Sequence, residues 1–161
     1  REEVMRVYDS SVGKAMCSHS GTFAGNPVTM AAGIAAMKML TPEAIERLNG
    51  LGDRARAGLR EAFRLADIDG QVTGEGSIIL MHFSSEPLGD YRATWRAHTD
   101  RRAEMLEDLF RHLLNRGILF STWGIGCLST PMGEAEVDHL AGAVLASLIE
   151  MKQETEKELA S

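Results

Sequence analysis

One stretch of the chain, residues 18–27 (SHSGTFAGNP), combines residue types that can bind an anion. Gly21 and Gly25 have no Cβ atom, so their backbone N–H groups can approach a ligand closely. The hydroxyls of Ser20 and Thr22 lie beside Gly21 in the sequence and can donate short hydrogen bonds to an oxyanion. This combination predicts an anion site, with phosphate as the natural ligand.

A helix is expected directly after this stretch. Asn26 is a good N-cap, and Pro27 suits the first helical position because that position needs no N–H donor. Residues 28–40 are rich in alanine and glycine, which favours a helix that packs closely on several sides in an interior. The alternative is that the loop is an ordinary turn that caps this helix through Asn26. The loop alone does not decide between the two.

Other glycine pairs do not form a dinucleotide site. Residues 74–76 and 124–126 each begin like a GxGxxG loop, but Ile79 and Ser129 occupy the position of the last glycine. Neither stretch opens a helix after a strand, so we exclude dinucleotide binding.

The histidines and cysteines predict no metal site. None of them shows ligand spacing. One histidine, next to the anion loop, could face the site, and the others are expected on the surface or in helices. Trp123 is expected to pack between two strands, with lining the mouth of an active site as the alternative. The histidines and cysteines are His19, His82, His98, His112, His139, Cys17 and Cys127.

Composition limits the classes of function. The chain has 161 residues and a net charge of −6, with no basic stripe to neutralise a nucleic-acid backbone. No apolar run approaches the roughly 20 residues that span a bilayer. The charged start Arg1-Glu2-Glu3 is not a signal peptide, and the unclustered cysteines fit a reducing compartment. We therefore expect a cytoplasmic protein. Because the sequence does not begin with Met, we expect the C-terminal part of a longer chain.

A long amphipathic helix is predicted from Pro42 to Ala66, where apolar residues recur with helical spacing. Gly50 and Gly52 are expected to kink or interrupt it. Five arginines occupy much of its other side and are expected to form a solvated face. They are Arg47, Arg54, Arg56, Arg60 and Arg64.

The remainder of the sequence alternates strands and helices. Strands are predicted at 71–73 and 77–83, then one long helix from Asp90 to the C′ glycine Gly117. A strand pair at 118–121 and 125–129 precedes a final helix over 134–151, and residues 152–161 are expected to fray. This order predicts an α+β layer with a small, mainly antiparallel sheet. We place a domain boundary between residues 52 and 53.

The anion loop also carries a family resemblance. The stretch GTFAGNP at 21–27, followed by MAAG at 30–33, resembles the GT[FL]xGNPxxMAAG motif of class III aminotransferases. The segments VTGEGS at 72–77, LLNRGI at 113–118 and LST at 128–130 resemble later parts of the glutamate-1-semialdehyde 2,1-aminomutase branch. These segments occur in the family's order over essentially the whole chain. The resemblance implies an α/β enzyme of fold type I that depends on pyridoxal 5′-phosphate (PLP).

The resemblance also assigns roles to the loop. It implies that Thr22 and Gly21, with Ser20 beside them, bind the cofactor phosphate across the interface of a homodimer. It implies that residues 1–52 are a remnant of the large PLP-binding domain, and that residues 53–161 are the small C-terminal domain. The family's catalytic lysine lies well upstream of the loop, and none of Lys14, Lys38, Lys152 and Lys157 fits its context. We therefore assign no catalytic residue to this chain.

Two hypotheses follow. In the first, the chain is the C-terminal part of a PLP-dependent aminotransferase or aminomutase that acts on a small amino or carbonyl compound. Without a Schiff-base lysine it is inactive by itself. In the second, it is a non-catalytic stand-alone fragment or a subunit that completes a partner's site. Residues 124–131 lack the arginine with which many class III enzymes hold a substrate carboxylate, so the substrate stays open. Exposed apolar surface on helix 28–38 would favour self-association.

Overall fold

The computed structural model describes residues 2–9, 11, 13–17, 21, 23 and 25–160, with the backbone alone for 158–160. The chain forms two compact units, Arg1–Thr41 and Pro42–Ser161. The sequence-based boundary after residue 52 falls inside a helix of the second unit, whose Leu48 and Leu51 are both buried. The assignment of residues 1–52 to a cofactor domain stays a prediction.

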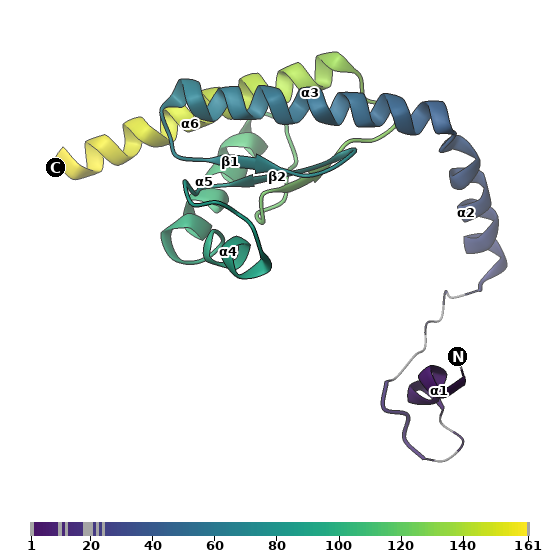
Figure 1. Ribbon diagram of the computed structural model, residues 1–161. Coiled ribbons are helices and arrows are strands. Elements are labelled where there is room, and N and C mark those ends of the chain that lie inside the picture. The colour runs from purple at the N-terminus through teal and green to yellow at the C-terminus, as the bar shows by residue number, and fades with distance from the viewer. Residues whose placement is uncertain are drawn as a thin grey trace. The chain divides into compact units, whose positions relative to one another are not determined.

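The first unit contains α1 (Glu2–Met5), the 3₁₀ turn η1 (Arg6–Tyr8) and α2 (Pro27–Met39) (Figure 1). The predicted helix after the anion loop is therefore confirmed. However, none of its residues is buried, and Met30, Ile34 and Met37 are all more than half exposed. The expected interior position is thus not seen within this chain, and self-association through this helix stays a prediction.

The second unit is the predicted α+β layer. Its sheet has the order β1-β2-β3, and both strand pairs are antiparallel. Val72 lies opposite Met81 and Ile79 lies opposite Gly126, which fixes the register. The elements are α3 (Pro42–Ala66), β1 (Gln71–Thr73), β2 (Ile78–His82), α4 (Tyr91–Arg96), α5 (Asp100–Asn115), β3 (Ile125–Cys127) and α6 (Glu134–Ala160).

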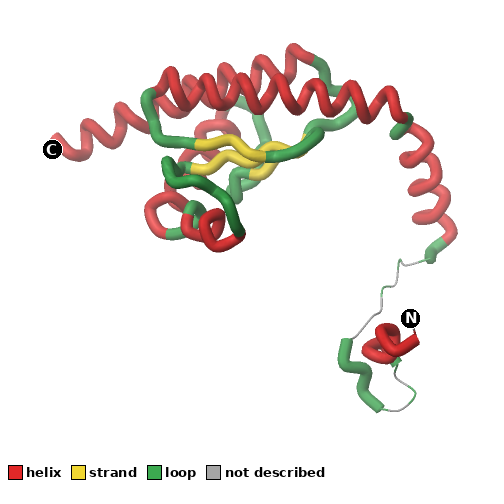
Figure 2. The backbone as a smooth tube through the Cα atoms, viewed as in Figure 1, coloured by secondary structure: helices red, strands yellow, loops and turns green. Residues whose placement is uncertain are grey.

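The core of this unit lies between the helices and one face of the sheet. Helices α3 and α6 run side by side above the three short strands (Figure 2), and α5 packs against α6. Alternate residues of β2 face this core, because successive side chains of a strand point to opposite faces. Burying each large side chain contributes about 1.5–3 kcal/mol. The largest include Leu59, Phe63, Ile79, Met81, Leu109, Leu113, Val144 and Leu148, all at most 2 % exposed.

The prediction that glycines interrupt α3 is wrong, because the helix continues through both Gly50 and Gly52. Gly52 serves a packing role instead. A Cβ atom at this position would lie 1.8 Å from the carbonyl oxygen of Gly76, in the turn between β1 and β2. Gly50 has open space around it. The missing side chain at Gly52 therefore allows this turn to approach the helix.

The arginines of α3 do not form a merely solvated face. Arg56 is buried and donates to the carbonyl oxygens of Gly76 and Ile78 at 2.7 and 2.8 Å. Arg60 donates to the carbonyl oxygen of Val72, and Arg54 forms a two-bond ion pair with Asp138 of α6. These bonds satisfy backbone acceptors and join α3 to the sheet and to α6.

Two further expectations are corrected in the region after β2. The single long helix is split into α4 and α5, since Asp100 has a left-handed φ of 53° that breaks the helical path. The strand predicted at 118–121 does not form, and β3 pairs with β2. Phe120 belongs to this segment, and its ring occupies the space beside Gly126. A Cβ atom at position 126 would lie 2.4 Å from the ring.

The C-terminal tail is helical rather than frayed, since α6 extends to Ala160. Lys152 explains part of this order. Its ammonium donates to the carbonyl oxygens of Ala66 and Asp67 at 3.3 and 3.1 Å, and to the Asp67 carboxylate at 2.8 Å. The side chain therefore satisfies carbonyls at the end of α3 and ties α6 to that end.

Candidate functional site

The anion loop is only partly described by the structure. Ser20 and Thr22 lie outside the described residues, so their predicted contacts with a phosphate stay predictions. Gly21 is described and exposed, which leaves its backbone open to a ligand. Gly25 has a φ of +71°, a left-handed conformation that glycine adopts without strain. Gly25 thus supplies the turn that leads the loop into α2.

Asn26 caps α2 as its residue type predicted. Its side-chain oxygen accepts hydrogen bonds from the backbone N–H groups of Val28 at 2.9 Å and Thr29 at 3.4 Å. Its backbone oxygen accepts from the N–H of Met30 at 2.9 Å, and Pro27 has no N–H. The first donors of α2 are therefore already used. An anion at this loop would depend on donors from residues 20–22, rather than on the helix N-terminus.

None of the four lysines is buried in the structure. Lys14 and Lys38 are exposed in the first unit, and Lys157 is exposed on α6. The ammonium of Lys152 is engaged by Asp67 and two carbonyl oxygens. A lysine that acts as a nucleophile needs an environment that favours its neutral amine, such as a desolvated pocket. The absence of a catalytic lysine from this chain stays a prediction.

The structure brings two histidines, His82 and His98, together in a polar cluster. The sequence had predicted both on the surface or in helices. His82 is buried at the end of β2, with 1 % of its surface exposed. Its Nε2 lies 2.8 Å from the Thr73 hydroxyl of β1, and its Nδ1 lies 2.8 Å from Nε2 of His98, which follows α4. The His98 ring is stacked at a centroid distance of 6.4 Å on the ring of Trp123, which is 61 % exposed.

Burial makes this histidine pair neutral near pH 7. Desolvation, with the nearby His98 as a second cause, lowers the pKa of His82 to about 4. Desolvation also lowers the pKa of His98. No sequence signal indicated the pair, because the two histidines are 16 positions apart and meet only through the strand register and the corner after α4. The pair could hold Trp123 in a fixed orientation.

In the part of the chain that the structure describes, no cluster of three His, Cys, Asp or Glu side chains could hold a metal ion. No helix among the described residues is long and apolar enough to cross a membrane.

Comparison with known proteins identifies relatives of the chain. It is 38% identical over 146 residues to the β-phenylalanine transaminase of Variovorax paradoxus, covering 89% of this chain and 32% of that protein. It is 33% identical over 127 residues to a glutamate-1-semialdehyde 2,1-aminomutase of Myxococcus xanthus, covering 77% of this chain and 28% of that protein. The chain thus spans about a third of the length of the curated relatives it matches. No family model matches it.

Solved structures agree with these relatives. An ω-transaminase from Sphaerobacter thermophilus superposes with a TM-score of 0.75 at 42% identity, covering 92% of this chain and 33% of that one. The chain belongs to the class III aminotransferase family. A further family structure, a transaminase with PLP bound, matches with a TM-score of 0.71 at 39% identity over 96% of this chain and 34% of that one. The predicted fold class and the family's cofactor are thereby confirmed.

The matches include both transaminases and aminomutases, so they leave the chemistry within the family open. In the segment where many class III aminotransferases carry a carboxylate-binding arginine, this chain has residues 124–131 without one. Gly124 is buried there with a φ of +71°, and Gly126 adjoins the Phe120 ring. This segment therefore offers no guanidinium.

Proposed function

We propose that the chain supplies the C-terminal part of a PLP-dependent class III aminotransferase or aminomutase that acts on a small amino or carbonyl compound. In this proposal, Ser20, Gly21 and Thr22 bind the cofactor phosphate across the interface of a homodimer. The observation that carries the proposal is the 38–42% identity to transaminases over about nine-tenths of the chain. The N-cap of Asn26 and the position of Pro27 at the start of α2 support it.

The described part of the loop leaves Gly21 open to a phosphate. Gly21 is exposed, and the helix donors behind it are capped by Asn26. When bound, PLP supplies an electron sink for bond breaking at the substrate. The role of this chain would be to hold the phosphate with charge-assisted hydrogen bonds from the loop, which are roughly twice as strong as neutral ones.

The second candidate, a non-catalytic fragment or complementing subunit, is favoured by the lysines. No described lysine is buried, so the covalent anchor of the cofactor would have to come from sequence beyond these 161 residues. Incubating the chain with PLP, followed by borohydride reduction and peptide mapping, tests the assignment of no catalytic lysine to this chain. Labelling of one lysine at equimolar PLP would contradict our assignment. Diffuse or absent labelling would support it.

The phosphate contact is tested with Thr22→Ala in the assembled enzyme. Because a hydrogen bond to a charged group contributes about 1.5–3 kcal/mol, we expect PLP affinity to fall roughly ten- to a hundredfold. Affinity for pyridoxal, which lacks the phosphate, should stay the same. Thr29→Ala is the matched control, since it removes an exposed hydroxyl from the first turn of α2. Equal losses for PLP and pyridoxal, or no loss for PLP, would refute the contact.

A further inference from the structure

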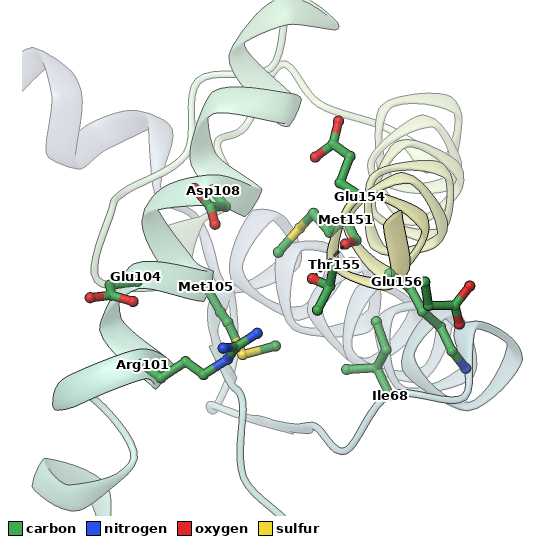
Figure 3. Close-up of a pocket in the computed structure, with 10 residues that line it drawn as sticks. Ile68, Arg101, Glu104, Met105, Asp108, Met151, Glu154, Thr155 and Glu156 are labelled. Carbon is green, nitrogen blue, oxygen red and sulfur yellow. Dashed lines mark hydrogen bonds between the residues drawn. The ribbon is translucent and has the colours of Figure 1, made fainter. Parts of the chain in front are cut away.

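A cavity of about 380 Å³ opens in the second unit between α5, α6 and the segment after α3. Its apolar wall is formed by Ile68, Met105 and Met151 (Figure 3). The volume lies within the range of small-molecule sites, about 300–1,000 Å³. Methionine side chains adapt to ligands of irregular shape because they are flexible and polarizable.

One end of this cavity carries an unpaired cation. The guanidinium of Arg101, from the first turn of α5, lies beside Met105 at the edge of the cavity (Figure 3). Arg101 is exposed, and no hydrogen bond or ion pair joins it to another residue that the structure describes. The other cation of the lining, Lys152, is already held by Asp67 at 2.8 Å. Arg101 is therefore the group that is available to a ligand anion.

The other end of the cavity carries carboxylates. Asp108 lies seven positions after Arg101 on α5, which corresponds to about 10 Å along the helix axis. Glu154 of α6 lies on the facing side, and Figure 3 shows Asp108 on the α5 side with Arg101 and Glu154 beyond Met151. Asp108 is bonded to Arg111, and Glu154 lies 3.4 Å from the His112 ring. A carboxylate accepts several hydrogen bonds, so both keep acceptor capacity.

We propose that this cavity binds an ω-amino acid, a molecule whose carboxylate and primary ammonium are separated by several methylene groups. The carboxylate pairs with the planar guanidinium of Arg101, which suits bidentate recognition. The methylene chain lies along Met105 and Met151, and the ammonium lies between Asp108 and Glu154.

The arrangement selects against related molecules. An α-amino acid carries its ammonium and its carboxylate on the same carbon, so it cannot reach both ends of the cavity. A dicarboxylate would place its second anion next to Asp108 and Glu154. Every residue of this site belongs to the second unit, whereas the phosphate loop belongs to the first.

The probe is 6-aminohexanoate, titrated into the ¹⁵N-labelled 161-residue chain and followed by amide shifts. Hexylamine, hexanoate and norleucine, each lacking one feature of the ligand, are the comparisons. We expect 6-aminohexanoate to bind at least tenfold more tightly than each of them, with shifts centred on residues 101–108 and 151–156. Equal binding of hexylamine, shifts elsewhere, or no binding would overturn the proposal.

Variants separate recognition from general charge effects. Arg101→Gln should bring the affinity for 6-aminohexanoate down to that for hexylamine, while hexylamine binding stays the same or improves. Arg92→Gln removes an exposed arginine of α4 and should change neither affinity. Met105→Trp, which fills the cavity, should abolish binding with the spectrum of the folded chain preserved. An unchanged preference for 6-aminohexanoate in Arg101→Gln would overturn the assignment of the carboxylate end.

Discussion

Acidification from pH 7 to pH 5 is expected to weaken the second unit through one buried side chain, His82. Its two ring nitrogens face the Thr73 hydroxyl and the His98 ring, and no charged partner among the described residues lies against it. Burial therefore favours the neutral ring and lowers the pKa of His82 from 6.5 to about 4. In the unfolded chain the same ring is solvated and keeps its ordinary pKa.

The direction follows from proton linkage. Above pH 6.5 the ring is neutral in both the folded and the unfolded state. In that range His82 therefore adds no pH dependence to the free energy of unfolding. Below pH 6.5 the unfolded state takes up the proton first, and stability falls until the folded pKa near 4 is reached. For these two pKa values the loss at pH 5 is about 2 kcal/mol, and at pH 4 it is about 3 kcal/mol. The pKa of His98 is lowered too, so His98 acts in the same direction.

The assay is urea unfolding followed by circular dichroism at pH 7, 6 and 5, with His82→Gln as the test variant. The window avoids the ion-paired carboxylates, since the pKa values of Asp67 and Asp138 are lowered by Lys152 and Arg54 respectively. Wild type should lose about 2 kcal/mol more than His82→Gln between pH 7 and pH 5. His139→Gln removes an exposed histidine and should keep the full loss.

An NMR titration of the histidine rings tests the cause directly. A His82 ring that titrates near its ordinary pKa in the folded chain would refute the burial argument. The same conclusion follows if His82→Gln shows the same pH dependence as wild type.

Two further predictions use matched pairs on α3 and the same urea assay at pH 7. Gly52→Ala should destabilise by about 1–3 kcal/mol, since its Cβ would lie 1.8 Å from the Gly76 oxygen. Gly50→Ala, in open space, should stabilise by up to about 1 kcal/mol. Arg56→Met should cost about 2–4 kcal/mol by leaving two carbonyl oxygens without their donor. Arg64→Met, which loses an exposed pair, should barely move the midpoint. The reverse order within either pair would contradict the packing argument.

Local signals in the sequence predicted the elements whose causes are local. The cap at Asn26, the C′ glycine Gly117 with φ +76° and the helical spacing along α3 all act within a few residues. The sequence does not predict the break before α5, because aspartate is only a weak indicator of the left-handed backbone that Asp100 adopts. The strand predicted at 118–121 is replaced by a segment whose Phe120 ring lies beside Gly126.

Long-range partners account for the remaining differences. An arginine on a helix surface looks solvated until the carbonyl that it meets is known. Arg56 bonds to oxygens 20 and 22 positions away, and Arg47 reaches the Met132 oxygen 85 positions away. The pair of His82 and His98 depends in the same way on the strand register. Sequence periodicity identifies the buried stripe of a helix, but it carries no record of such partners.

The anion loop shows why its two interpretations are compatible. A helix-capping turn and a phosphate site would compete if both used the N–H groups at the start of α2. The structure assigns those donors to Asn26 through the bonds to Val28 and Thr29. An anion at the loop is thus left with the backbone of Gly21 and the hydroxyls beside it. The Thr22 hydroxyl would then be one of a few donors and contribute a large part of the binding free energy. Its removal should therefore lower the affinity for PLP and leave the affinity for pyridoxal unchanged.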